Sequence, residues 1–159
     1  MADPIDKDEG LEGCRPVMLA LASRTPEKAS PRTQDWRFPS TAQSVRTMRG
    51  KLRPFIAESG LPDAEIDDLV LAACEAAANG VEHARHPTEP FFDVRAQVDG
   101  HHVRIVVRDY GRWTMRRADP GHRGRGLRMM TMLAAVSLTS GPTGTSVTLQ
   151  SLVDGRPGG

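Results

Sequence analysis

The sequence is organised around the stretch I-D-D-L-V-L-A-A-C-E-A-A-A-N-G-V-E-H-A, residues 66–84. Apolar residues recur in it at three- and four-residue spacing, which predicts one long helix. Acidic residues crowd its start, where negative charge favours the helix dipole. The main buried face is expected to consist of Ile66, Leu69, Val70, Ala73 and Ala77.

Two polar side chains stand out in this helix. Glu75 and Asn79 are four residues apart, so they project from one face, opposite the main buried face at about 100° per residue. Their neighbours are small and apolar, and burying a carboxylate and an amide without partners costs free energy. We therefore expect both to line a pocket. The alternative is that both simply form hydrogen bonds with a neighbouring loop.

The residues before this helix predict a strand and another helix. Trp36 to Phe38 alternates with polar neighbours, which is typical of a short strand. Ser40 or Thr41 can cap the helix that follows, and its apolar stripe continues to about Glu58. Pro54 should kink or split that helix. The stripe comprises Val45, Met48, Leu52 and Phe55.

The residues after the long helix predict a hairpin. Its strands run from Phe91 to Val98 and from His102 to Asp109, joined by an Asp-Gly turn at residues 99–100. Because strands and helices do not alternate regularly, the sequence predicts an α+β two-layer sandwich. The remaining elements expected are a helix over 126–134 and strands over 136–139 and 145–152.

Composition indicates one domain with one core. The chain has 159 residues, of which 38% are hydrophobic, and a formal charge of +1. No apolar run approaches the roughly 18 residues of a membrane span, and the acidic opening lacks a signal peptide, so we expect a cytoplasmic protein. Cys14 and Cys74 make neither a disulfide framework nor a zinc site, and Cys74 is expected to be a small core residue.

The domain boundaries follow from the distribution of polar sequence. Residues 1–33 are mostly polar and rich in proline, so we expect a largely disordered segment. Residues 34–153 form the expected domain. Residues 154–159 form a glycine-rich, flexible tail.

Two further motifs have the chemistry of a ligand site. Asp109 ends a strand, where it can accept a hydrogen bond from an amine, and Gly111 lets the backbone pass close to a ligand. Gly124-Arg-Gly-Leu127 opens a helix, and the exposed backbone N–H groups of a helix start can bind phosphate. This motif lacks the lysine of a P-loop and the spacing of a dinucleotide fingerprint.

The arginine-rich segment and the pair of histidines near the end of the long helix can each be interpreted in two ways. From Arg104 to Arg128 the chain carries eight arginines but only two acidic residues, so this segment is either a solvated basic face or a site for a polyanion. His83 and His86 have a spacing that can hold a metal, but no third ligand has a convincing spacing. A histidine near a helix C-terminus is also favourable without a metal, and we prefer that interpretation.

Taken in order, these motifs resemble the GHKL ATPase superfamily. The run from Glu75 to Ala84, then Asp109-Tyr-Gly111, Gly124-Arg-Gly-Leu127 and Gly144-Thr145 carry the resemblance, over roughly residues 34–152. The chain is most similar to the RsbW-type bacterial anti-sigma factors, which are serine-protein kinases. The resemblance implies the Bergerat fold, with helices on one face of a mixed, mostly antiparallel sheet. It also implies that ATP lies between a helix and a lid.

The resemblance implies roles for individual residues. Glu75 would be the general base, and Asn79 would coordinate Mg²⁺ that bridges the phosphates. Asp109 would hold the adenine amine, Gly111 would border the adenine, and Thr145 would contact it through water. The phosphates would be held by Gly124, Arg125, Gly126 and Leu127.

The resemblance further implies protein partners. Such a protein binds a sigma factor, and it phosphorylates a serine or threonine of an anti-anti-sigma antagonist protein, which regulates transcription. A homodimer is compatible with this class, and Arg49 is the nearest match to an arginine used for partner contacts. The alternative is a module of the same fold that binds nucleotide without transferring phosphate. A nucleic-acid binder is a third, less favoured class.

The sequence departs from the superfamily at one position of the lid. Trp113 stands where a second glycine is common, and the lid, about residues 112–123, is short. We expect this departure to bear on nucleotide affinity and lid closure more than on the fold. Trp113 is either a packing residue or a direct ligand contact.

Overall fold

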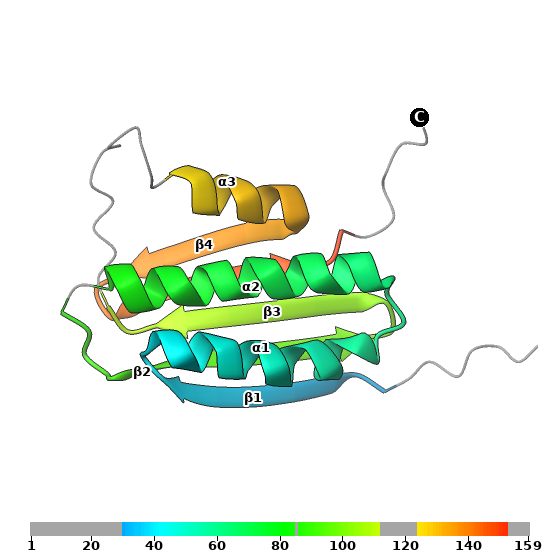
Figure 1. The fold of residues 1–159 in the computed structure, drawn as a ribbon, viewed down its shortest axis with the longest axis horizontal. Helices are drawn as coiled ribbons and strands as arrows, with labels where there is room; N and C mark the ends of the chain where they lie inside the picture. Colours follow the sequence, from blue (N-terminus) through cyan, green and yellow to red (C-terminus); the bar gives the residue numbers. More distant parts are fainter. Residues whose placement is uncertain (1–29, 85, 112–123, 153–159) are drawn as a thin grey trace, which may run out of the picture.

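The computed structural model describes residues 30–84, 86–111 and 124–152. The expected disordered segment lies almost wholly outside these ranges, as do the lid with Trp113 and the tail. The elements, all but β5 labelled in Figure 1, are β1 Arg32–Pro39, α1 Ala42–Ala57, α2 Asp63–His83, β2 Phe91–Asp99, β3 His102–Asp109, α3 Gly124–Leu133, β4 Ala135–Gly141 and β5 Gly144–Gln150.

One five-stranded sheet contains all the described strands, in the order β1-β2-β3-β5-β4. Every neighbouring pair is antiparallel, so the expectation of a mixed sheet is corrected to an antiparallel one among these strands. Tight turns join β2 to β3 and β4 to β5, and such turns can join only antiparallel neighbours. The predicted hairpin is confirmed: Asp99 pairs with His102, and Gly100 takes a φ of +58°.

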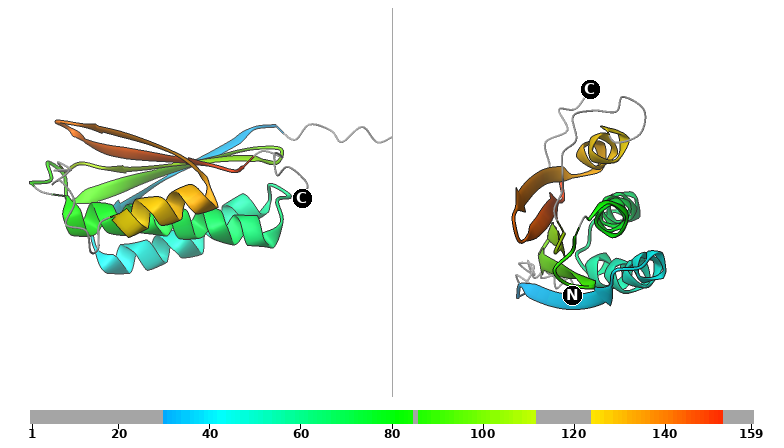
Figure 2. Two further views of the ribbon diagram at one scale, coloured as in Figure 1. Left: turned by 90° about the horizontal axis from the view of Figure 1, so that it is seen from above. Right: turned by 90° about the vertical axis from the view of Figure 1, so that its left-hand side faces the viewer.

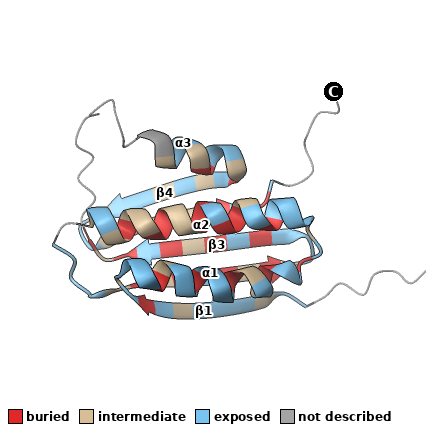
Figure 3. Ribbon diagram, viewed as in Figure 1, coloured by how far each residue is buried: buried red, intermediate tan, exposed pale blue. Residues whose placement is uncertain are grey.

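The molecule has two layers, and all three described helices cover one face of the sheet (Figure 2). The α+β prediction is therefore confirmed. Alternate side chains of β2 and β3 enter the core between the layers, because successive residues of a strand point to opposite faces. The buried residues shown in red in Figure 3 gather on the facing sides of α1, α2 and the sheet. The other face of the sheet is polar.

The helices begin and end largely where the sequence predicts. Thr41 caps α1, since its side chain accepts a hydrogen bond from the N–H of Ser44. Pro54 neither splits nor ends α1, and its neighbours Leu52 and Ile56 are fully buried, so packing holds the last turns together. All five residues predicted for the main buried face of α2 are buried. Within the described ranges, no helix is both long enough and apolar enough to cross a membrane.

Candidate functional site

The centre of the candidate site is one face of α2. Glu75 and Asn79, one turn apart, are both half-buried. The first turn of α3 packs against them: a Cβ atom on Gly126 would lie 2.4 Å from Oε1 of Glu75 and 3.3 Å from Nδ2 of Asn79. Because glycine has no side chain, the backbone of α3 comes directly up to the carboxylate and the amide.

The two polar side chains are open to a ligand. Among the described residues, neither Glu75 nor Asn79 has a hydrogen-bonding or ion-pair partner, so bonds to a described loop do not explain them. No fully buried side-chain nitrogen or oxygen in these ranges lacks a partner, so the polar atoms of both residues must retain access to solvent. A carboxylate and an amide thus face the same solvent-accessible region beside the start of α3.

Asp109 lies beside Gly80, the residue that follows Asn79 in α2. The Asp109 side chain is buried, and its Oδ1 accepts a hydrogen bond of 3.0 Å from the N–H of Gly111. A Cβ atom on Gly80 would lie 3.1 Å from Cβ and 3.3 Å from Oδ2 of Asp109, so α2 approaches this carboxylate closely. Across the sheet, Asp109 pairs with Thr145, whose buried hydroxyl lies 3.1 Å from that of Ser140.

Two glycines allow the backbone to close around this end of β3. Gly144 has a φ of +138°, and a Cβ atom on it would lie 2.1 Å from the carbonyl oxygen of Asp109. A Cβ atom on Gly111 would lie 2.3 Å from Cβ of Ala84, next to the end of α2. Neither space admits a side chain without movement of the backbone, and the φ of Gly144 also disfavours any other residue.

The predicted site residues thus form one group in space, with one exception. The group extends along α2, from Glu75 and Asn79 at the start of α3 to Asp109 at the end of β3. Gly124 is the first residue of α3, and Leu127 is 38% exposed on that helix. The side chain of Arg125 lies outside the described residues. The exception is Arg49, which is exposed on α1.

Sequence reasoning gave no role to two of the glycines that bring the group together, Gly80 and Gly144. Gly80 lies inside a helix, and a glycine at such a position is itself a signal of close approach. Gly144 looked like an ordinary turn glycine, and nothing local indicated that it lies against Asp109. Tyr110, discussed below, carried no recognisable signal.

The described residues give no support to a histidine or cysteine metal centre. His83 and His86 are both exposed, and no group of three His, Cys, Asp or Glu side chains in the described ranges could hold a metal ion. Cys74 is half-buried and packs against the core, where burial raises the pKa of its thiol and keeps it protonated. The prediction of a packing role for Cys74 is confirmed.

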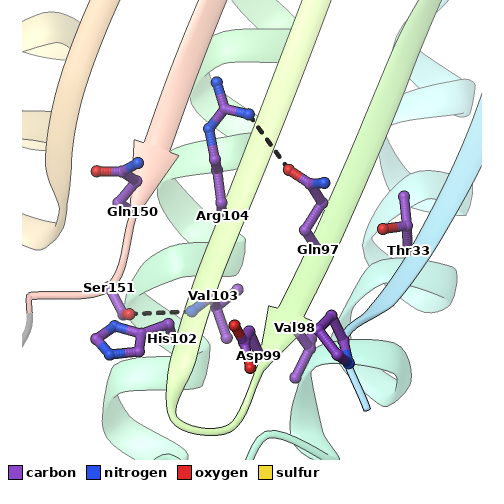
Figure 4. A pocket seen from close by; sticks show the side chains of 10 residues that line it. Thr33, Gln97, Val98, Asp99, His102, Val103, Arg104, Gln150 and Ser151 are labelled. Atoms are coloured by element: carbon purple, nitrogen blue, oxygen red, sulfur yellow. Dashed lines mark hydrogen bonds between the residues drawn. The ribbon is translucent and has the colours of Figure 1, made fainter.

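One hollow in the described part of the chain lies away from this group. It has a volume of about 530 Å³ and is open to solvent on the outer face of the sheet, at the end of β3 opposite Asp109 (Figure 4). Gln97 accepts a hydrogen bond from Arg104 there. The hollow shares no residue with the group around α2.

The chain belongs to the histidine kinase-like ATPase domain family, whose model matches residues 38–151. Membership of an ATPase domain family implies that the chain binds ATP. The structure is similar to that of the RsbU and RsbW domains of Rv1364c from Mycobacterium tuberculosis, with 30% sequence identity and a TM-score of 0.61. That match covers 75% of this chain and 32% of the other, so this chain spans about a third of the solved protein.

A second similar structure is the histidine kinase domain of the blue-light activated histidine kinase from Erythrobacter litoralis EL346. It shares 20% sequence identity with this chain at a TM-score of 0.49, over 71% of this chain and 60% of the other.

Proposed function

We propose that this protein is an ATP- and Mg²⁺-dependent anti-sigma factor that phosphorylates a serine or threonine of an antagonist protein. The observation that carries the proposal is the pair of half-buried polar side chains, Glu75 and Asn79, facing the start of α3 without described partners. Similarity to a protein with an RsbW domain at 30% identity supports this choice among members of the family.

The end of β3 suits an adenine ring. Asp109 presents a carboxylate at the strand end, where it would accept a hydrogen bond from the exocyclic amine. Gly111 would border the ring, and the buried hydroxyl of Thr145 would contact it through a water. The phosphates would then lie toward α3, held by Gly124, Arg125, Gly126 and Leu127, since N–H groups at a helix start attract anions.

The region between α2 and α3 suits a magnesium ion. Mg²⁺ prefers oxygen ligands and usually binds through one or two protein groups together with phosphates. The amide oxygen of Asn79 can supply such a ligand, and the absence of a side chain at Gly126 brings the start of α3 close to Asn79 and Glu75. When bound, the ion would neutralise charge on the phosphates.

Glu75 is proposed as the general base. It would accept the proton of the serine or threonine hydroxyl as that oxygen attacks the γ-phosphorus, while the bond from this phosphorus to the oxygen shared with the β-phosphate breaks and ADP leaves. Its position on the same helix face as Asn79 would place the base beside the phosphates. Sigma-factor binding would use a different surface, and a homodimer is compatible with the proposal.

The proposal predicts that Arg49→Ala weakens sigma-factor binding and leaves ATP affinity unchanged. Arg49 is exposed on α1, and truncating an arginine that is an interface hot spot costs about tenfold or more in affinity. Binding is measured with a panel of sigma factors by surface plasmon resonance. Arg104→Ala, which removes the same charge from the outer face of the sheet, is the control. If the Arg49 variant and the wild type bind equally well to every sigma factor that the wild type binds, Arg49 is not a partner contact.

The function itself is tested with labelled ATP, Mg²⁺ and candidate antagonist proteins. The expected result is label transferred from the γ-phosphate to a serine or threonine of one antagonist, and none to a version lacking that hydroxyl. ATP binding without transfer to any cognate antagonist would favour the alternative, a nucleotide-binding module without kinase activity.

A further inference from the structure

A cluster of side chains on the outer face of the sheet surrounds Tyr110, the residue between Asp109 and Gly111. Its members come from the three neighbouring strands β1, β2 and β3 or the residue that follows β3. They are Arg37, Phe91, Asp93, Arg108 and Tyr110.

Asp93 is the centre of this cluster. Its two carboxylate oxygens accept hydrogen bonds from Arg37, of 2.7 Å from Nε and 3.0 Å from Nη2. The hydroxyl of Tyr110 donates to Oδ2 of the same carboxylate at 2.5 Å. The hydrogen bond from Arg37 in particular lowers the pKa of Asp93, so the carboxylate remains charged and a strong acceptor at neutral pH.

Contacts with neighbouring side chains hold the ring of Tyr110 in place, in addition to its hydroxyl. It packs edge-on against Phe91, with ring centroids 5.2 Å apart, and the guanidinium of Arg108 lies 5.0 Å from the ring centre. The guanidinium of Arg37 stacks 3.8 Å from the ring centre of Phe91 and so ties the cluster to β1. The side chain of Tyr110 therefore has little freedom.

The backbone of Tyr110 is held at the same time. Its carbonyl oxygen accepts hydrogen bonds from Thr88, of 2.9 Å from the N–H and 3.2 Å from the hydroxyl. A Cβ atom on Gly144 would lie 3.1 Å from Cα of Tyr110. Because neighbouring residues in an extended chain point to opposite faces, holding Tyr110 on the outer face fixes Asp109 on the helix-covered face.

We propose that Tyr110 and Asp93 are positioning residues for nucleotide recognition, acting through Asp109 from the opposite side of the sheet. The inference rests on the proposed function, in which Asp109 recognises the adenine amine. Loss of the contact between Tyr110 and Asp93 lets the strand end shift, and a misplaced carboxylate distinguishes adenine less well from other bases.

The test compares ADP with inosine diphosphate, which has an oxygen where adenine has its amine. Dissociation constants for both are measured by calorimetry for the wild type, Tyr110→Phe and Asp93→Asn. The matched control is Asp35→Asn. Asp35 forms the same two-bond pair with Arg95 on the same outer face, at 2.6 and 3.2 Å, without touching Tyr110. Thermal unfolding of each variant accompanies the titrations.

The preference for ADP over inosine diphosphate is expected to fall about fivefold or more in the Tyr110 and Asp93 variants, and to stay at the wild-type value in the Asp35 variant. An unchanged preference in Tyr110→Phe overturns the inference while leaving the proposed function intact. An equal fall in Asp35→Asn also overturns it, because the effect would then reflect general weakening of the sheet. A wild type that binds no adenine nucleotide overturns the proposed function and this inference with it.

Discussion

Glu75→Gln is expected to lower phosphoryl transfer to the antagonist about 10²–10⁴-fold, the usual effect of losing a general base. Glutamine keeps the size and polarity of the side chain, so the contact with the first turn of α3 at Gly126 should survive. A neutral amide, however, cannot take up the hydroxyl proton. ATP affinity and sigma-factor binding should therefore remain close to the wild-type values.

This substitution is measured by the rate of single-turnover transfer at saturating ATP, with ATP affinity determined separately. Glu82→Gln is the matched control, since Glu82 lies on α2 and is exposed. If wild type and the Glu75 variant transfer phosphate at the same rate, Glu75 is not the base. If both transfer and ATP affinity fall equally, Glu75 acts in binding rather than in proton transfer.

Asp109→Asn is expected to raise the dissociation constant for ATP about 5- to 150-fold, the consequence of a buried polar contact that costs about 1–3 kcal/mol when it is lost. Oδ1 of Asp109 accepts the N–H of Gly111. An asparagine has a single acceptor oxygen, so if that oxygen keeps the contact with Gly111, its NH₂ group turns toward the adenine amine. Two donors then face each other.

The affinity is measured by calorimetry beside Asp99→Asn, which makes the same chemical change at the other end of the hairpin. Equal ATP affinity in the wild type and the Asp109 variant would mean that the adenine lies elsewhere. A comparable loss in the Asp99 variant would point to a general effect on the sheet.

The periodic parts of the fold were predictable from the sequence. The buried stripe of α2 and the alternation along β2 and β3 are local patterns set by helix and strand geometry. The shared face of Glu75 and Asn79 follows from the same geometry. The strand β1 begins at Arg32, before the apolar residues that indicated it, because pairing with β2 extends it in both directions.

The close approaches in the site were not predictable in this way. Whether Gly80 lies against Asp109, or Gly144 against the carbonyl of that residue, depends on how a helix and two strands pack together. The same holds for Tyr110, since its partner Asp93 lies on another strand. Pro54 is the converse case: a local rule predicted a kink or a split, yet α1 continues through Pro54, whose neighbours Leu52 and Ile56 are buried in the core.

The most direct test of the central claim, that this group of residues binds ATP with magnesium, is a calorimetric titration of wild type and Asn79→Ala with ATP, each with and without Mg²⁺. We expect one saturable site in the wild type, with affinity that rises when Mg²⁺ is added. In the Asn79 variant, binding should be weaker and the response to Mg²⁺ reduced. No binding by the wild type, or the same Mg²⁺ response in both proteins, would contradict it.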